Sequence, residues 1–170
     1  MARRVVLLVL LVVLSGCTSA GSPSPSAPSP SAPATGSCDY AVRRDVLPAW
    51  ARAGFSDPSP SGTPYVMGTR GDILGVLFGY PLKAPPASPG PTNKILWVSR
   101  VPVTTGDTLR ISARREGATE SVNREVPGGP GPSTVDLPTP GCWHLTLSWS
   151  GHTDTVDLRY DPVGSPHGGS

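Results

Sequence analysis

Short stretches in which apolar and polar residues alternate recur through the second two thirds of the chain. In residues 142–149, every second residue from Trp143 to Trp149 is a tryptophan or a leucine. An alternation of period two places such side chains on one face of a β-strand. Together with the Pro/Gly-rich segments between them, these stretches predict seven or eight strands, within residues 65–69, 73–80, 94–101, 109–114, 119–126, 133–137, 142–149 and 154–160.

This pattern favours a mainly β fold, an antiparallel β-sandwich, with a small open β-barrel as the alternative. The regular helix–strand alternation of a parallel α/β sheet is absent. Residues 119–126 are more polar than the other stretches, so we expect them at a sheet edge. One short helix is expected in residues 47–54, with Pro48 in its first turn and Gly54 at its end. Trp50 and Phe55 are its expected core contacts.

The first 16 residues are typical of a secretory signal peptide, with Arg3 and Arg4 before an apolar run over residues 5–14. The sequence Leu14-Ser-Gly-Cys17 resembles the lipobox of bacterial lipoproteins, in which the cysteine receives a diacylglycerol and begins the mature chain. The resemblance implies a lipidated Cys17 and an anchor on the extracytoplasmic face of the cell membrane. An ordinary cleaved signal is the alternative, and a run of ten apolar residues is too short to span a bilayer.

The composition changes sharply after the lipobox. Residues 17–37 are rich in Pro, Ser and Ala and hold no large apolar side chain, which predicts a disordered tether after the lipidated cysteine. In a polyproline II conformation, at ~3.1 Å per residue, the tether would reach about 60 Å. Residues 38–162 are expected to form one β-sandwich domain, and residues 163–170 a disordered tail.

Charge narrows the choice of partners. The chain has 14 basic and 12 acidic residues, and removal of the signal with Arg3 and Arg4 leaves 12 of each. A net charge of zero gives no support to nucleic-acid binding or to membrane adhesion through a polybasic patch. The expected partners are the membrane, through lipidated Cys17, and an envelope protein or a cell-wall component.

The three cysteines are Cys17, Cys38 and Cys142. With Cys17 lipidated, Cys38 and Cys142 are predicted to form a disulfide, because disulfides persist outside the cytoplasm. Two separate thiols are the alternative. A metal site is less favoured, because neither cysteine has a second Cys or a His at ligand spacing.

Catalytic chemistry has few candidates. His144 and His152 are the histidines of the predicted domain, and Asp154 and Asp157 follow them closely. No Gly-x-Ser-x-Gly elbow presents a serine to them, and their spacing matches no zinc signature. We therefore expect both histidines to be solvated, with no catalytic residues, no metal and no cofactor. The adhesion-like tripeptide Arg70-Gly-Asp72 is interpreted as a hairpin turn.

A possible binding surface involves Trp97, Gly75 and Gly79. Residues 95–101 are apolar on both faces, which suits a central strand with a buried Trp97, whereas an exposed Trp97 would belong to a binding patch. The two glycines leave one face of residues 73–79 open to a packed neighbour or to a ligand.

Four segments carry a wider resemblance: Trp50-Ala-Arg-Ala-Gly-Phe, Gly71-Asp-Ile-Leu-Gly-Val-Leu-Phe-Gly, Lys94-Ile-Leu-Trp-Val-Ser-Arg and Pro140-Gly-Cys-Trp-His-Leu-Thr-Leu-Ser-Trp-Ser-Gly. They resemble uncharacterised actinobacterial lipoproteins over most of residues 38–162, and the Pro-Gly-Cys-Trp stretch resembles the penultimate strand of immunoglobulin-like domains. The resemblance carries no assigned function. The expectation is a lipid-anchored binding or envelope-interaction domain without catalysis. The alternatives are an envelope enzyme or enzyme inhibitor using His144 and His152, or an accessory subunit of a transporter or signalling system.

Overall fold

The computed structural model describes residues 38, 41–56, 62–86 and 93–164. All of them belong to one compact unit. The predictions for the signal peptide, for Cys17 and for the tether lie outside the described residues, as does most of the predicted tail. Within these ranges no helix has the length and apolar character needed to cross a membrane.

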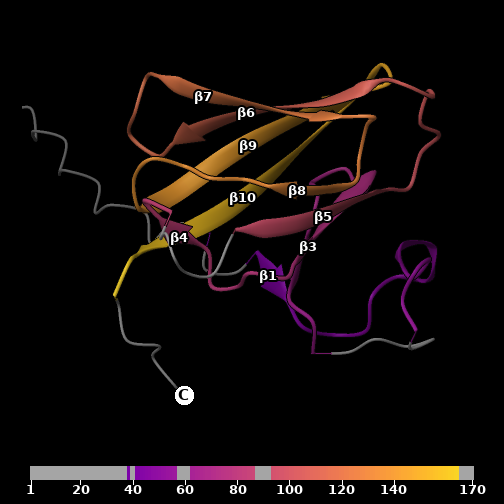
Figure 1. The fold of residues 1–170 in the computed structure, drawn as a ribbon, viewed down its shortest axis with the longest axis horizontal. Helices are drawn as coiled ribbons and strands as arrows, with labels where there is room; N and C mark the ends of the chain where they lie inside the picture. Colours follow the sequence, from indigo (N-terminus) through magenta and orange to yellow (C-terminus); the bar gives the residue numbers. More distant parts are fainter. Residues whose placement is uncertain (1–37, 39–40, 57–61, 87–92, 165–170) are drawn as a thin grey trace, which may run out of the picture. The chain divides into compact units, whose positions relative to one another are not determined.

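The described residues form a mainly β, sandwich-like fold of two five-stranded sheets, one of them curled into a half-barrel (Figure 1). The first sheet has the order β1-β2-β3-β5-β8, with the bounds Val42–Arg43, Tyr65–Met67, Ile73–Leu77, Lys94–Ser99 and Pro132–Thr134. The second has the order β4-β10-β9-β6-β7, with the bounds Lys83–Ala84, His152–Pro162, Gly141–Trp149, Thr108–Arg115 and Ser121–Pro127. Neighbouring strands are antiparallel except β4 and β10.

The core lies between the two sheets and follows the predicted alternation. Trp143, Leu145, Leu147 and Trp149 of β9 are all buried, as are the apolar residues of β6 and β10 that were expected to face inward. Ile95 and Trp97 of the first sheet belong to the same core cluster as these residues. The strand predicted as an edge, β7, lies at the end of its sheet.

The buried tryptophans keep their indole N–H groups hydrogen-bonded. Trp149 donates to the hydroxyl of Ser99 in the opposite sheet at 3.0 Å, and Trp97 donates to the hydroxyl of Ser133 at 3.1 Å. Trp143 donates to the carbonyl oxygen of Thr139 at 3.0 Å. Since an unpaired buried N–H is costly, these bonds favour one arrangement of the large rings.

The expected helix in residues 47–54 is wrong. Only a single 3₁₀ turn, η2 (Ala49–Ala51), forms there; Pro48 before it is extended, and no side chain caps the turn. A segment this short gains little from helix formation and is shaped instead by what it buries. Leu47 and Ala51 are fully buried, whereas Trp50 and Phe55, the expected core contacts, are only partly buried.

This segment packs on the outer face of the first sheet and makes a second, smaller core with Tyr65, Leu74 and Val76. The strands β3 and β5 therefore have apolar contacts on both faces, as predicted for residues 94–101. Leu96 and Val98 pack against this second cluster, while Ile95 and Trp97 pack in the core between the sheets.

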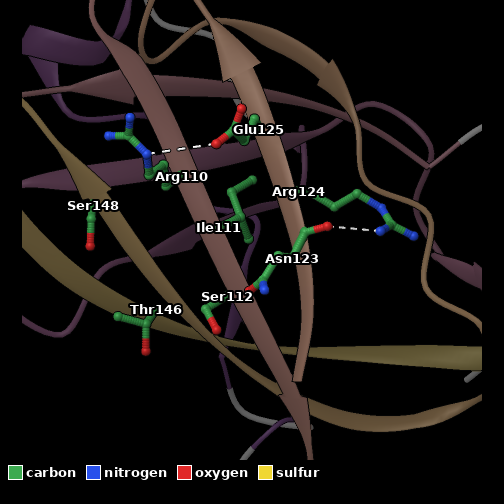
Figure 2. Close-up of a pocket in the computed structure, with 8 residues that line it drawn as sticks. All are labelled: Arg110, Ile111, Ser112, Asn123, Arg124, Glu125, Thr146 and Ser148. Carbon is green, nitrogen blue, oxygen red and sulfur yellow. Dashed lines mark hydrogen bonds and ion pairs between the residues drawn. The ribbon is translucent and has the colours of Figure 1, made fainter. Parts of the chain in front are cut away.

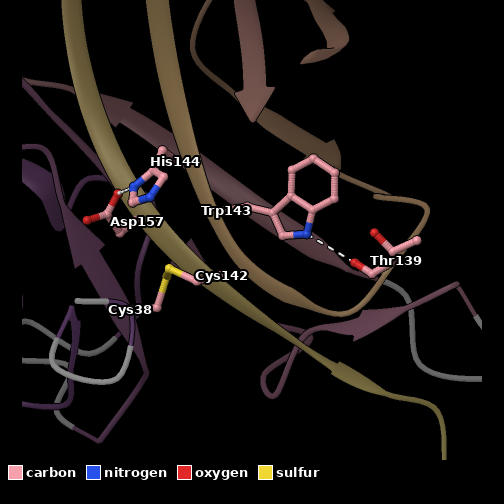
Figure 3. The surroundings of a disulfide bond; sticks show 6 residues. All are labelled: Cys38, Thr139, Cys142, Trp143, His144 and Asp157. Atoms are coloured by element: carbon pink, nitrogen blue, oxygen red, sulfur yellow. Dashed lines mark hydrogen bonds and ion pairs between the residues drawn. A yellow bond between two sulfur atoms is a disulfide. The ribbon is translucent and has the colours of Figure 1, made fainter. Parts of the chain in front are cut away.

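Cys38 and Cys142 lie at disulfide-bonding distance, with 5.8 Å between their Cα atoms, as predicted (Figure 3). Both residues are buried. The bond joins a residue that precedes β1 to the long strand β9 across a sequence separation of 104 residues. It therefore links the N-terminal end of the described chain to the beginning of β9, the central strand of the second sheet.

Replacement of Cys38 or Cys142 by Ser should lower the melting temperature by roughly 10 °C or more. The reason is that a closed loop of this size limits the unfolded chain by about 4–5 kcal/mol. The double variant should be hardly less stable than either single variant, because each replacement already removes the whole bond. Thermal unfolding measures the stabilities, and intact mass without reductant should show two hydrogens fewer than the reduced chain. Two free thiols in protein purified without reductant would contradict the pairing.

Candidate functional site

The outer face of the second sheet carries a polar surface built from the alternate residues of β7, β6 and β9. The strand register sets Arg110 opposite Ser148, and Ser112 opposite Thr146. On the other side of β6, Asn123 lies opposite Ser112. Because residues that are opposite across a sheet are neighbours, these side chains form adjoining rows rather than scattered surface groups.

A shallow groove of about 380 Å³ lies on this surface. Figure 2 shows its eight lining residues: Arg110, Ile111, Ser112, Asn123, Arg124, Glu125, Thr146 and Ser148. The groove presents hydroxyl groups, an amide and the ion pair of Arg110 with Glu125, whose Nε and Oε1 atoms are 3.6 Å apart. Both partners are largely exposed, so solvent screens their attraction. Their hydrogen-bonding capacity remains accessible to a ligand.

Arg124 lines the groove, but backbone carbonyl groups already occupy its guanidinium. Its guanidinium donates to the carbonyl oxygen of Asp136 through Nε at 3.2 Å and through Nη2 at 2.8 Å, and to the carbonyl oxygen of Asn123 at 2.8 Å. We conclude that Arg124 holds the edge strand β7 near the segment that follows β8, whereas Arg110 is the cation of the groove.

His144 also lies on this face, where it pairs with Asp157. The Nδ1 atom of His144 is 2.6 Å from Oδ1 of Asp157, and both side chains are partly exposed (Figure 3). The expectation that His144 is solvated is therefore incomplete, because it also has a carboxylate partner. Arg114 lies opposite His144 on the neighbouring strand.

His144 and His152 do not share a site. His152 pairs with Trp149 in the register, packs against that ring at 5.9 Å between centroids, and lies on the inward side of β10. His144 pairs with Asp157, five residues further along β10, which at ~3.4 Å per residue separates the two histidines by about 17 Å. The structure therefore does not bring the two histidines together in one site. The described residues hold no group of His, Cys, Asp or Glu suited to a metal ion.

Asp154 has a structural role that the sequence pattern did not indicate. Its side chain is only 2% exposed, on the inward side of β10. It accepts hydrogen bonds from the backbone N–H groups of Arg70 at 2.9 Å and of Asp72 at 3.1 Å. Its carboxyl also occupies the space beside Gly68, where a Cβ atom would be 2.2 Å from Oδ2.

The adhesion-like tripeptide is thus a turn between β2 and β3, as predicted. Gly71 has φ +74°, and its N–H donates to the carbonyl oxygen of Gly68 at 2.9 Å. The left-handed conformation favours glycine at this position.

Trp97 and Gly75 belong to the core and form no binding surface. Trp97 is 1% exposed, which confirms the buried interpretation, and its ring lies over Gly75. The open face of Gly75 is therefore filled by a neighbouring side chain. Gly79 is half-buried just after β3, and its N–H donates to the carbonyl oxygen of Lys94 at 3.3 Å.

Exposed aromatic residues instead gather on the outer face of the first sheet. Phe78 is 53% exposed and stacks on Phe55, with ring centroids 6.4 Å apart. Tyr80 is 39% exposed, and the guanidinium of Arg44 lies 5.3 Å from its ring centroid. We call Trp50, Phe55, Phe78 and Tyr80 the aromatic patch.

Shifted pKa values occur in the core and in turns. Burial, reinforced by the negative charge of Asp136, raises the pKa of the Tyr160 hydroxyl, which donates to the carbonyl oxygen of Val135 at 2.8 Å. Hydrogen bonds from the backbone N–H groups of Thr108 and Ser150 hold the pKa of the Asp107 carboxyl below its usual range. The Tyr160 hydroxyl thus holds the segment after β8, and the Asp107 carboxylate holds the turn between β9 and β10.

Comparison of the chain with protein-family models, with curated proteins and with solved structures found no match.

Replacement of Asp154 by Ala should destabilise the fold by about 2–4 kcal/mol, because it leaves the N–H groups of Arg70 and Asp72 without their acceptor. Asp157→Ala is the matched control, on the same strand but on the outer face. It should cost less than about 1 kcal/mol, since the pair with His144 is partly exposed. Chemical denaturation measures both values. Equal losses for the two variants would contradict the buried role of Asp154.

Proposed function

We propose that this chain is a lipid-anchored, extracytoplasmic domain that binds an envelope ligand without catalysing a reaction. Support for the location comes from two independent features. The first is the lipobox-like sequence that ends at Cys17. The second is the pairing of Cys38 with Cys142, since disulfides persist mainly in oxidising compartments.

An immunoglobulin-like identity of the sandwich is part of this proposal, and the strand order supports it. In the second sheet, β7-β6-β9-β10 correspond in order to strands C′, C, F and G of such domains, and β3, β5 and β8 correspond to A, B and E. The short β4, parallel to β10, would be the part of strand A that changes sheets. The chain departs from the pattern in its added β1 and β2 and in its disulfide, which starts before β1 instead of on the B strand.

The groove on the outer face of the second sheet is the observation that carries the binding function. Its hydroxyl, amide, guanidinium and carboxylate groups can each donate or accept hydrogen bonds. Such a set matches a ligand with many hydroxyl groups, and therefore a carbohydrate of the cell envelope. The groove also has the size of a small-ligand site. His144, on the same face, pairs with Asp157 and is not among the residues that line the groove, which supports binding over catalysis.

Arg110→Ala and Asn123→Ala should each weaken binding of soluble envelope polysaccharide about tenfold, which corresponds to ~1.4 kcal/mol. Each variant removes hydrogen-bonding groups from the groove. Arg114→Ala is the matched control, because it removes the same charge from the same face of β6 outside the groove. Isothermal titration calorimetry measures the affinities. Unchanged affinity in both groove variants would show that the ligand binds elsewhere.

Cys17→Ala should abolish incorporation of labelled fatty acid and release the protein from the membrane fraction, or leave it as an unprocessed precursor. The physical reason is that a diacylated cysteine holds a protein firmly, whereas a neutral mature chain has no comparable attachment. Membrane fractionation and metabolic labelling measure the result. Cys38→Ser controls for the loss of a cysteine and should remain acylated. Acylation that persists in Cys17→Ala would contradict the anchor.

A further inference from the structure

The aromatic patch exposes two large rings, Phe78 at 53% and Tyr80 at 39%. Both residues follow β3 directly, and Phe55 stacks on Phe78. Trp50 and Phe55 also pack against the second core cluster. The rings of Trp50 and Phe55 are therefore held in place by packing on one side, while part of their surface stays accessible.

The surroundings of the patch are cationic. Residues 43–52 contain Arg43, Arg44 and Arg52 but only one acidic residue, Asp45, which accepts a hydrogen bond from Tyr65 at 2.7 Å. Arg43 and Arg44 are exposed, and Arg44 lies over the Tyr80 ring. Aromatic rings flanked by arginines are the combination found where proteins meet the headgroup region of a bilayer.

The charges of the domain are also divided between its two parts. Residues 38–104, which include every strand of the first sheet except β8, hold seven basic and four acidic residues. Residues 105–164, which supply β6, β7, β9 and β10, hold five basic and eight acidic residues. The part of the chain that carries the aromatic patch therefore has an excess of three positive charges (seven minus four), which an anionic surface attracts.

We infer that the aromatic patch docks on the anionic membrane surface to which the chain is anchored. This inference rests on the proposed lipid anchor, because the short segment between Cys17 and Cys38 would keep the domain close to the bilayer. The anchor gives the domain a high effective concentration at the bilayer. At that concentration, a face with weak affinity for the lipid surface is enough to dock the domain. The outer faces of the two sheets point in opposite directions, so docking turns the groove with Arg110 and Asn123 away from the membrane.

The test uses the acylated mature chain in vesicles of phosphatidylglycerol and phosphatidylcholine, with vesicles of phosphatidylcholine alone for comparison. Trp97, Trp143 and Trp149 are at most 3% exposed, so accessible quenchers report mainly on Trp50. In vesicles with the anionic lipid, brominated lipid should quench Trp50, and aqueous iodide should quench it less than in pure phosphatidylcholine. Both effects should diminish at high salt, because salt screens the arginines.

Phe78→Ser and Arg44→Glu should each shift the ratio of docked to undocked domain about tenfold towards the undocked form, by loss of apolar contact and by reversal of a charge near the surface. The matched controls are Val103→Ser, which changes an exposed apolar residue outside the patch, and Arg114→Glu, on the opposite face. Both controls should dock like the unaltered chain. Circular dichroism should confirm that all four variants are folded.

Three results would overturn the inference. One is full access of iodide to Trp50 on anionic vesicles, and another is unchanged quenching by brominated lipid in Phe78→Ser and Arg44→Glu. The third is a dimer in sedimentation that Phe78→Ser dissociates, because the patch would then bind a second copy. Flotation of the protein together with the vesicles tests the lipid anchor separately. A chain that floats but does not dock rejects this inference alone, whereas a chain that does not float rejects the anchor in the proposed function.

Discussion

The contact between the ring of Trp97 and the backbone of Gly75 is the constraint on which the two-sheet arrangement depends. A Cβ atom at residue 75 would lie 2.8 Å from the ring, so the indole fits only because β3 has a glycine at that position. The same indole donates to Ser133 of β8 and thereby also fixes the next strand of the sheet. Loss of a buried aromatic side chain of this size costs about 3–5 kcal/mol in typical cores.

The remaining interior is organised by a few buried polar groups that tie short segments to long strands. Asp154 on β10 holds the turn between β2 and β3. Asn93 exchanges hydrogen bonds with the backbone of Lys83 at 2.8 and 2.9 Å, and so holds β4 in place. Because a buried polar group without a partner is costly, these contacts give the short segments one defined position. The disulfide does the same for the start of the domain.

The two sheets present different outer faces, and this difference connects the fold to the proposed roles. The outer face of the first sheet is apolar, because β3 and β5 carry apolar residues on both of their faces. The segment around η2 covers only part of this outer face. The outer face of the second sheet is polar and carries the groove. One sandwich thus offers an aromatic, cationic face and a hydrogen-bonding face on opposite sides, which suits a domain that stands between a membrane and a ligand.

The sequence by itself determined eight of the ten strands, their inward faces and the cysteine pairing. The two-residue strands β1 and β4 were not predicted, because so short a segment shows no alternation. In β6, β9 and β10 the alternation of apolar residues is regular enough that burial follows it closely, and with Cys17 assigned to the lipid only one pairing remained. Alternation could not show what Asp154 does on the inward side of β10, because the N–H groups that stabilise its carboxylate are more than 80 residues away. Nor could it show the groove, which exists only in the mutual register of β6, β7 and β9. The tertiary structure decided these features, because each depends on groups that become neighbours only when the strands pair.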